Sequence, residues 1–472
     1  MGKSFDYDTI IIGGGAAGIT AALSLAKAKK KVAIVEAGRL GGANLNYRDV
    51  PYHAAQNFAH TYAEAMAGVK FGITSTNLRY NYPTALRVQL RAVTRAGEKF
   101  GKKALEAEGI TCISGLAHFV SANEISVRRR LPAVPTAAEA KAGTDGKTLT
   151  AARFLIATGS IPKVSEITGL SEAKHYTPEN ALRMEKLPKS MLVIGGGPSG
   201  VELAEYFASL GVKVVIVELS ERLLPREDEE VGQIMSAYLE KKLGVKILTK
   251  TRAVAVQGDT ISSKVTLARN GQEKSVRVEC IVAAVGSKPN TDLGLENAGV
   301  KFDNKGIYVE KTLQTTAKNI YAAGDVVGGD SATELANYEA GVAAANMLGR
   351  NKTTVNYDGF MRTIDTNPQV ATVGMTEDDL MKRDLKYNKA MLPLSAVSAA
   401  ITSDFKLGFV KLLSNSQGKI LGAMMMAPDA AANLQEVALC VRHGLSVVEV
   451  ASTPHINGEW GELIRLAAKK LI

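Results

Sequence analysis

The sequence predicts an α/β protein with two Rossmann-like domains followed by a C-terminal α+β domain, and three observations lead to this fold class. The 472 residues are too many for one hydrophobic core and suggest about three domains. A pattern of strand, glycine turn, helix and strand occurs twice, from Asp8 and again from Met191. From about residue 351 the glycine signals stop, and expected strands at 408–413 and 419–426 with a helix at 433–443 indicate an α+β domain.

The first pattern has the residues that a dinucleotide site needs. An apolar strand enters a turn with Gly13, Gly15 and Gly18, a helix follows, and a second strand ends at Glu36. Gly13 permits the tight turn, Gly15 lets the backbone approach a pyrophosphate, and Gly18 lets helix and strand pack closely. The Glu36 carboxylate can accept hydrogen bonds from both ribose hydroxyls of an adenosine, whereas it would repel a 2′-phosphate.

The second pattern repeats the first with Gly195, Gly197, Gly200 and Glu218. Its first glycine and its carboxylate are separated by 23 positions, as in the first unit. A single glycine fingerprint is weak evidence, because glycine turns also serve ordinary helix packing. Two complete units with matched carboxylates predict two dinucleotide-binding domains.

Three further expected strands run into small-residue turns, at 157–162, 284–290 and 321–327. Such turns let a backbone pass close to a ligand, which makes Thr158, Gly159 and Gly286 candidate contacts. Asp325 ends an apolar strand and is placed to bind a polyol hydroxyl. The alternative is that Asp325 caps the helix that follows.

Composition restricts the partners and the location. The apolar fraction of 46% is that of a folded protein, and 57 basic against 47 acidic residues give a net charge of +10. Dinucleotides are anionic, so the charge does not discriminate between nucleic acid, an anionic membrane and an acidic cofactor as the partner, and we expect no nucleic acid partner and no membrane span. No run of eighteen apolar residues and no signal peptide is found, which favours the cytoplasm. Cys112, Cys280 and Cys440 share no metal or redox spacing, so we expect buried thiols and no metal site.

Other strings resemble those of the pyridine nucleotide-disulfide oxidoreductase family, the group of dihydrolipoamide dehydrogenase, glutathione reductase and mercuric reductase. They are Leu-Leu-Pro at 223–225 followed by Asp228, Pro-Asn-Thr at 289–291 with the segment 293–300, and Pro-Gln-Val-Ala-Thr-Val-Gly at 368–374. The resemblance implies FAD in the first unit, with Asp325 on its ribitol and Gly42 and Ala117 among its contacts, and NAD(H) in the second. It also implies an FAD-binding domain at 1–160 and 291–350, an NAD-binding domain at 161–290, and a homodimer formed through a dimerisation domain at 351–472.

The sequence departs from the family where the family carries its two redox cysteines. Residues 41–53 read Gly-Gly-Ala-Asn-Leu-Asn-Tyr-Arg-Asp-Val-Pro-Tyr-His, so Asn44 and Asp49 stand at the cysteine positions. Neither can form a thiolate or a disulfide. The family also pairs a lysine after the second cysteine with a glutamate near the flavin. Here Glu202 holds the glutamate position, while Tyr52 and His53 occupy the lysine stretch. His53 can replace the lysine if it points inward, and the alternative is a surface-facing histidine.

The C-terminal signature departs in the same way. The family's His-Pro-Thr-x-Ser-Glu is replaced by Asn-Gly-Glu-Trp-Gly-Glu at 457–462. Asn457 therefore stands where the family has its acid–base histidine, Glu462 is retained, and His455 lies two residues too early for that role. The candidate catalytic residues are Asn44, Asp49, His53, Glu202, Asn457 and Glu462.

These observations predict an FAD-dependent NAD(P)H oxidoreductase without a disulfide relay. Electrons would pass from NADH through FAD directly to an acceptor such as a quinone or a dye, as in thiol-less relatives that act as quinone reductases. One alternative is a non-catalytic or sensing flavoprotein in which the cofactor stabilises the fold. Another is a pyridine nucleotide transhydrogenase or an oxidase.

Overall fold

The computed structural model describes residues 4–74, 77–128, 146–163, 167–258, 261–349 and 352–472. Clustering of the residue contacts divides the chain into two compact units. The first unit comprises Met1–Ala55, Pro83–Lys163 and Gly286–Asn356, and the second comprises Gln56–Tyr82, Val164–Val285 and Tyr357–Ile472. Residues 56–82, which the sequence assigned to an FAD-binding domain, thus cluster with the second unit, and the three-domain boundaries stay a prediction.

The first unit contains a seven-stranded sheet in the order β3-β2-β1-β6-β5-β4, with β19 also paired to β6. Its parallel strands are β1 (Tyr7–Ile12), β2 (Val32–Glu36), β3 (Ile110–Ser114), β6 (Lys147–Ile156) and β19 (Ile320–Ala322). Strands β4 (Leu116–Ser121) and β5 (Glu124–Arg128) continue the sheet in antiparallel pairing. The helices associated with this unit are α1 (Ala16–Lys27), α2 (Gly42–Asn46), α4 (Tyr82–Gly97), α5 (Lys102–Ala107) and α10 (Thr333–Met347).

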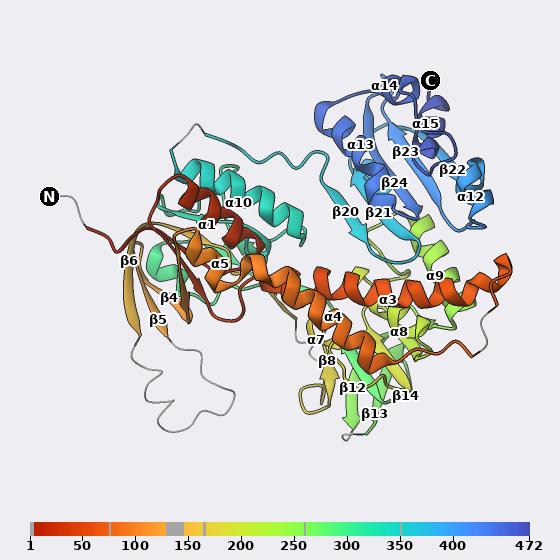
Figure 1. Ribbon diagram of the computed structural model, residues 1–472, viewed down its shortest axis with the longest axis horizontal. Helices are drawn as coiled ribbons and strands as arrows, with labels where there is room; N and C mark the ends of the chain where they lie inside the picture. The colour runs from red at the N-terminus through yellow and green to blue at the C-terminus, as the bar shows by residue number, and fades with distance from the viewer. Residues whose placement is uncertain (1–3, 75–76, 129–145, 164–166, 259–260, 350–351) are drawn as a thin grey trace. The chain divides into compact units, whose positions relative to one another are not determined.

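Both faces of this parallel sheet are buried, which explains why its strands are continuous apolar runs. Ile11 and Leu155 point into the core that α1 and α10 cover. Ile10, Ile12 and Phe154 point into the core on the opposite face, which β4 and β5 also line. Helices α1 and α10 pack side by side (Figure 1).

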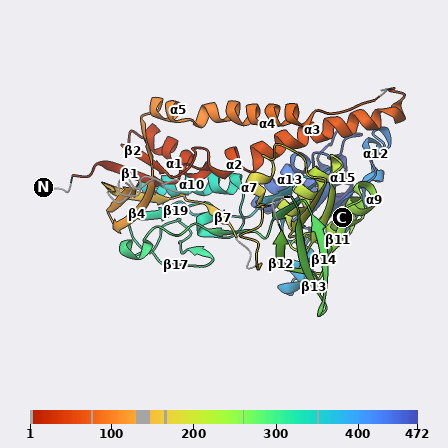
Figure 2. The ribbon, with the colours of Figure 1, turned by 90° about the horizontal axis from the view of Figure 1, so that it is seen from below.

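The second unit contains a five-stranded parallel sheet in the order β11-β10-β9-β15-β8. Its strands are β8 (His175–Tyr176), β9 (Ser190–Ile194), β10 (Lys213–Val217), β11 (Lys246–Leu248) and β15 (Cys280–Ala283), and its helices are α7 (Pro178–Ala181), α8 (Pro198–Ser209) and α9 (Glu229–Leu243). An antiparallel sheet of β12 (Arg252–Gly258), β13 (Ser263–Arg269) and β14 (Gln272–Val278) packs its apolar face against this sheet (Figure 2). Helix α3 (Asp49–Ala67) crosses the boundary between the two units.

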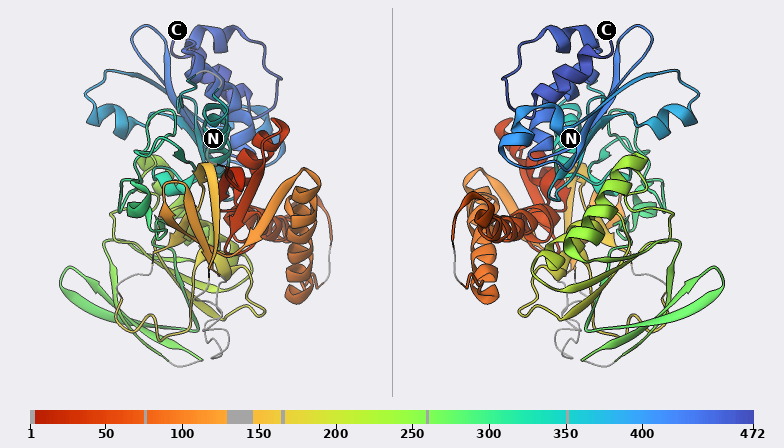
Figure 3. Two further views of the ribbon diagram at one scale, coloured as in Figure 1. Left: turned by 90° about the vertical axis from the view of Figure 1, so that its left-hand side faces the viewer. Right: turned by 90° about the vertical axis from the view of Figure 1, so that its right-hand side faces the viewer.

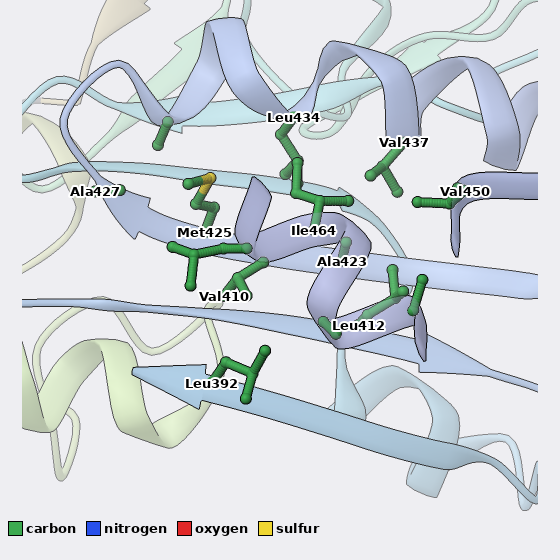
Figure 4. Packing of buried hydrophobic residues seen from close by; sticks show 14 of the residues in the cluster. Leu392, Val410, Leu412, Ala423, Met425, Ala427, Leu434, Val437, Val450 and Ile464 are labelled. Carbon is green, nitrogen blue, oxygen red and sulfur yellow. The ribbon is translucent and has the colours of Figure 1, made fainter. Parts of the chain in front are cut away.

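The C-terminal part of the second unit is built on the antiparallel sheet β20-β21-β24-β23-β22 (Figure 3). Its strands are β20 (Met361–Ile364), β21 (Gln369–Gly374), β22 (Asn388–Pro393), β23 (Phe409–Ser414) and β24 (Ile420–Ala427), and its helices are α11 (Glu377–Lys382), α12 (Ser398–Thr402), α13 (Ala430–His443), α14 (Val447–Ser452) and α15 (Glu462–Lys469). Val410, Leu412 and Met425 project from the sheet toward Leu434 and Ile464 of the covering helices (Figure 4). The two predicted strands and the predicted helix of this region all form, although α13 begins three residues earlier than expected.

Lys411 on β23 joins this antiparallel sheet to the start of α9 and to α11 in the same unit. Its buried ammonium group lies 3.1 Å from Asp228, 2.7 Å from Glu230 and 2.6 Å from Glu377. Among the described residues these three carboxylates form a group close enough together to hold a metal ion. Because the ammonium donates to all three, the cluster is an ion-pair network. Of the helices described, none has the length and apolar character needed to cross a membrane.

Candidate functional site

The first glycine turn is held by contacts that only glycine permits. Gly13 has a φ of +107°, and a Cβ there would lie 2.2 Å from the carbonyl oxygen of Ala157. A Cβ on Gly18 would lie 1.9 Å from the carbonyl oxygen of Gly13, so strand and helix pack through backbone alone. Gly42 has a φ of +59°, and its Cβ would lie 2.6 Å from the Cα of Gly15, so the 41–42 turn rests directly on the glycine turn.

The second glycine turn repeats this geometry. Gly195 has a φ of +113°, and a Cβ there would lie 2.3 Å from the carbonyl oxygen of Ala284. A Cβ on Gly200 would lie 2.0 Å from the carbonyl oxygen of Gly195. At Gly197, the counterpart of Gly15, no described atom lies within 4 Å of the Cβ position. The two turns are therefore equivalent in backbone, but the second is open where the first is covered.

Both turns present the N-terminus of a helix. Helices α1 and α8 have 12 residues each and begin after Gly15 and Gly197, and no described side chain caps either end. The first N–H groups of each helix therefore remain available to an anion, and the helix dipole favours one there. This arrangement fits the pyrophosphate of a dinucleotide.

The carboxylates that end the two second strands are oriented in the same way. Glu36 accepts a hydrogen bond from the N–H of Gly14 at 2.6 Å and another from Gly38 at 2.5 Å. Glu218 accepts equivalent bonds from Gly196 and Ser220, both at 2.6 Å. Each carboxylate oxygen keeps a further lone pair for a ribose hydroxyl. The paired donors hold a negative charge beside each glycine turn.

Arg222 is the nearest downstream arginine to Glu218 in sequence, and its guanidinium is engaged elsewhere. One nitrogen, Nη2, lies 3.0 Å from the carboxylate of Asp378 and donates to the carbonyl oxygen of Glu227 at 3.0 Å. These contacts keep the Arg222 guanidinium beside the Asp378 carboxylate, at the start of α11.

Asp325 lies at the end of β19 and binds side chains of its own unit. Its Oδ2 accepts a hydrogen bond from the Ser160 hydroxyl at 2.7 Å and lies 3.7 Å from the guanidinium of Arg48. The short 3₁₀ helix that begins here has Gly324 as its N-cap and no side-chain cap, so Asp325 does not serve as the cap residue. The carboxylate is held in place by side chains, which fits a role in binding a hydroxyl.

The predicted small-residue contacts lie in turns of the first unit. Thr158 donates its hydroxyl to the carbonyl of Asn290 at 2.8 Å, and the Asn290 N–H bonds to Gly159 at 2.9 Å. Gly159 and Gly286 both have positive φ, and no atom of the described residues lies within 4 Å of either Cβ position. Ala117 is buried on β4 opposite Val127.

Asn44, Asp49 and Thr333 form a closed triangle of hydrogen bonds. The Asn44 Nδ2 lies 2.7 Å from Asp49 Oδ2 and 2.8 Å from the Thr333 hydroxyl, which itself donates to Asp49 Oδ2 at 2.7 Å. All three side chains are partly buried. Thr333 is the first residue of α10, and the sequence analysis did not select it because it is distant in the chain from the other two residues.

The three cysteines are free and lie outside this triangle. Cys112 is on β3, Cys280 is buried in β15, and Cys440 is buried in α13. Burial raises the pKa of all three thiols, that of Cys280 to about 12. A thiol with a raised pKa holds little thiolate at neutral pH and reacts slowly.

Glu202 lies on α8 of the second unit, where its Oε1 accepts the N–H of Asp365 at 3.0 Å. His53 is on an exposed position of α3 in the first unit. The predicted pairing of His53 with Glu202 stays a prediction.

Of the C-terminal candidates, Glu462 is the first residue of α15 and Asn457 lies in the turn before that helix. Asn457 is exposed, and Glu462 accepts the N–H of Gly458 at 3.1 Å and pairs with Arg465 at 2.8 Å. The Gly458 hydrogen bond is the main reason that the pKa of Glu462 is lowered. His455 bonds to Glu436 at 2.8 Å and to the carbonyl of Thr453 at 2.9 Å, which is a structural arrangement.

Comparison with known proteins gives matches over almost the whole chain. The model of a family described as pyridine nucleotide-disulphide oxidoreductase matches residues 7–359, and the model of its dimerisation domain matches residues 360–468. Dihydrolipoyl dehydrogenase of Staphylococcus aureus is 32% identical over 472 residues, covering 99% of this chain and 97% of that protein. Mercuric reductase of S. aureus is 31% identical over 468 residues, covering 98% of this chain and 82% of that protein.

Solved structures match the fold as well. The copper(II) complex of the HOCl-induced flavoprotein disulfide reductase RclA from Escherichia coli has a TM-score of 0.86 at 24% identity, with 99% of each chain covered. LpdA from Mycobacterium tuberculosis has the same TM-score and identity, with 98% of this chain and 99% of that chain covered. These matches agree with the predicted α/β fold class.

Proposed function

Because the chain belongs to the pyridine nucleotide-disulphide oxidoreductase family, whose members are FAD-dependent enzymes that use NAD(H), we propose that it oxidises NADH without a disulfide relay. Electrons would pass through FAD directly to an acceptor such as a quinone or a dye. For a quinone the balanced reaction is NADH plus H⁺ plus quinone to NAD⁺ plus hydroquinone. This reaction differs from those for which the dihydrolipoyl dehydrogenase and mercuric reductase relatives are named.

The observation that carries the proposal is the hydrogen-bonded triangle of Asn44, Asp49 and Thr333. Residues 41–53 contain no cysteine, and the positions that correspond to the family's cysteines hold an amide and a carboxylate. These groups exchange hydrogen bonds with Thr333 and cannot store an electron pair. The three thiols elsewhere are poor substitutes because burial keeps them protonated.

We assign FAD to the first glycine turn. Its phosphates would lie at the N-terminus of α1, its adenosine ribose at Glu36 and its ribitol at Asp325, where Ser160 and Arg48 already fix the carboxylate. The remaining proposed FAD contacts are Gly13, Gly15, Gly18, Gly42, Ala117, Thr158 and Gly159. When bound, FAD supplies hydride acceptance and the ability to donate one or two electrons.

We assign NAD(H) to the second glycine turn, with Gly195, Gly197, Gly200, Glu202, Glu218 and Gly286 as contacts. The Glu218 carboxylate would accept the ribose hydroxyls of NADH and repel the 2′-phosphate of NADPH. Arg222 does not offset this repulsion, because Asp378 and the Glu227 carbonyl hold its guanidinium. A preference for NADH over NADPH follows.

On the acceptor side, the triangle would provide a polar wall and one ionisable group. Asp49 is that group, and reduction of a quinone requires protons as well as electrons. Asn44 and Thr333 would hold the Asp49 carboxylate in place through its Oδ2 atom. The match to the dimerisation domain supports a homodimer formed through residues 360–468.

A panel of acceptors tests the proposal. Purified protein loaded with FAD would be assayed with NADH, and then NADPH, against quinones, dyes, lipoamide, oxidised glutathione, mercuric ion, an NAD⁺ analogue and oxygen. The control is the same panel with the triple variant Cys112→Ser, Cys280→Ser, Cys440→Ser. We expect quinone or dye reduction of equal rate in both proteins and no disulfide or mercuric ion reduction. Turnover of lipoamide, or activity lost in the triple variant, would contradict the proposal. Exchange between pyridine nucleotides or high peroxide output would instead indicate a transhydrogenase or an oxidase.

A further inference from the structure

Two carboxyl groups on α8 hold one turn of the C-terminal sheet. Glu202 and Glu205 are three residues apart and therefore lie on the same face of the helix. Glu202 Oε1 accepts the N–H of Asp365 at 3.0 Å, and Glu205 Oε1 accepts the N–H of Asn367 at 2.8 Å. Both donors belong to the segment that joins β20 to β21. The helix that begins at the second glycine turn is thus bound to this segment by two adjacent acids.

Other side chains complete the attachment of this segment. The Gln56 amide donates to the carbonyl oxygen of Asp365. The Asp365 side chain accepts the Gln369 amide at 2.7 Å, and Gln369 accepts the N–H of Ala431 at 2.9 Å. The position of the Asp365 N–H, and with it the Glu202 carboxylate, is therefore fixed by the surrounding chain.

Glu205 is a buried acid, with only 4% of its surface exposed. Burial is the main cause that raises its pKa to about 8, and the neighbouring charge of Glu202 adds to the increase. The hydrogen bonds from Asn367, Tyr238 and Gln56 act in the opposite direction. The titratable groups that face it are Glu202 on its own helix and Tyr238 on α9, whose hydroxyl lies 3.4 Å away. Glu205 is therefore mainly protonated at neutral pH.

Ionisation of Glu205 would disturb the position of the Glu202 carboxylate. Two carboxylates one helical turn apart repel each other, and the repulsion is stronger because Glu205 is buried. The repulsion would displace Glu202 from the Asp365 N–H or would weaken the attachment of the segment to α8. A neutral Glu205 keeps its hydrogen bond with Asn367 and adds no charge.

We propose that Glu205 is a positioning residue for Glu202: in its neutral form it binds the β20–β21 segment to α8, and its ionisation weakens the binding of the nicotinamide coenzyme. The inference rests on the proposed function, because that proposal makes Glu202 a contact of NAD(H). Glu205 itself need not contact the coenzyme.

The substitution Glu205→Gln tests the inference, because a carboxamide has nearly the same shape, can accept the Asn367 N–H and does not ionise. The dissociation constant of NAD⁺ would be measured on FAD-loaded full-length protein from about pH 6.5 to about pH 9.5. We expect the wild-type affinity to fall about fivefold with a midpoint near pH 8. The variant should keep the neutral-pH affinity throughout. The control Glu240→Gln, an exposed acid on α9, should follow the wild-type curve.

Infrared spectroscopy gives a readout that is independent of turnover. The wild-type protein should show a protonated carboxyl band at neutral pH that disappears as the pH rises through about 8. This band should be absent in Glu205→Gln. Tyr238→Phe removes a hydrogen bond that lowers the pKa of Glu205, so it should move the midpoint of the band to higher pH.

The outcomes separate this inference from the proposed function. A pH-independent NAD⁺ affinity in the wild type, or an unchanged pH dependence in Glu205→Gln, overturns the role of Glu205 alone. A wild-type NAD⁺ affinity that falls with a midpoint near pH 8, and does not fall in Glu205→Gln, supports the role of Glu205. If the same protein reduces no quinone or dye, the proposed electron transfer is contradicted. Failure of the wild type to bind NAD⁺ at neutral pH overturns both.

Discussion

The two glycine turns have one backbone geometry but different surroundings. At the first turn, the Cβ position of Gly15 lies 3.7 Å from the Cα of Gly42, in van der Waals contact with the 41–42 turn. At the second turn, no described atom lies within 4 Å of the Cβ position of Gly197. A covered turn is suited to a cofactor that stays bound, and an open turn to one that exchanges. The difference therefore supports FAD as the resident ligand of the first turn and NAD(H) as the exchanging ligand of the second.

The helices that follow the two turns also differ at equivalent positions. Thr20 and Leu23 of α1 stand seven and ten residues beyond Gly13, as Glu202 and Glu205 stand beyond Gly195. Thr20 donates its hydroxyl to Asn337 of α10 at 2.8 Å, and Leu23 packs against the core. The fold of the repeat does not need acids at these positions. The acids of α8 are thus specific to the second unit.

The largest expected effects on ligand binding come from replacing the first glycine of each turn with alanine. In Gly13→Ala and Gly195→Ala, the new Cβ would lie 2.2 Å and 2.3 Å from a carbonyl oxygen, at a φ above +100°. Each change should cost at least about 2 kcal/mol locally. We expect Gly13→Ala to be purified without FAD, and Gly195→Ala to keep FAD but to bind NAD⁺ at least about tenfold more weakly. Flavin absorbance and NAD⁺ titration measure the two effects.

Alanine substitutions at two other glycines separate the effect of the close contact from the effect of a positive φ. Gly109 in the first unit and Gly211 in the second also have positive φ, but within the described part of the chain no atom lies within 4 Å of their Cβ positions. Alanine at either should leave both ligands bound. If Gly195→Ala also lost FAD, the assignment of one ligand to each turn would be wrong.

The second effect concerns stability and pH. The pKa of Glu205 is about 8 in the folded protein against 4.5 for an exposed glutamate, so the folded state binds more protons between these values. The wild type should lose stability as the pH rises from about 4.5 to about 8, with no further loss above. Glu205→Gln lacks this titration, so the free energy of unfolding of the variant relative to the wild type should rise by up to about 5 kcal/mol across this range. Denaturant unfolding of both proteins across this range measures the difference, and a constant difference would contradict the pKa.

The third effect concerns the two strand-end carboxylates. Glu218→Ala should narrow the preference for NADH over NADPH by about tenfold in kcat/KM, or about 1.4 kcal/mol, because the charge that repels the 2′-phosphate is removed. Glu36→Ala should weaken retention of FAD and leave the coenzyme ratio unchanged. Equal or better wild-type kcat/KM with NADPH would refute the assignment of Glu218.

The smallest expected effect is a change in coenzyme preference when the ion pair between Arg222 and Asp378 is removed. Asp378→Asn removes the carboxylate that lies 3.0 Å from the guanidinium, while the Glu227 carbonyl still accepts a hydrogen bond from it. We expect kcat/KM for NADPH to rise about threefold, which is less than 1 kcal/mol. The double variant Asp378→Asn, Arg222→Ala should return to the wild-type ratio. A rise that persists without Arg222 would show another cause.

The features that the sequence predicted well are local ones. Gly18 and Glu36, with their counterparts Gly200 and Glu218, act through neighbours within about two dozen residues, and residue spacing records such neighbours directly. Two βαβ units and the change of character near residue 351 were predictable for the same reason.

The features that were missed depend on contacts that are remote in sequence. Thr333 is 284 residues from Asp49, and Asn367 is 162 residues from Glu205, so neither hydrogen bond leaves a pattern in the chain. A serine or threonine at the start of a predicted helix could have identified Thr333 as a candidate. An acid at an otherwise apolar position of α8 could have identified Glu205.

The central claim is that no sulfur stands between flavin and acceptor, and anaerobic reductive titration tests it most directly. Purified protein would be titrated with dithionite and with NADH while the visible spectrum is recorded, for the wild type and for the triple Cys→Ser variant. We expect two electrons to reduce each FAD fully, no long-wavelength thiolate-to-flavin band to develop, and both proteins to behave alike. A requirement for four electrons, or a charge-transfer band that the triple variant lacks, would contradict it.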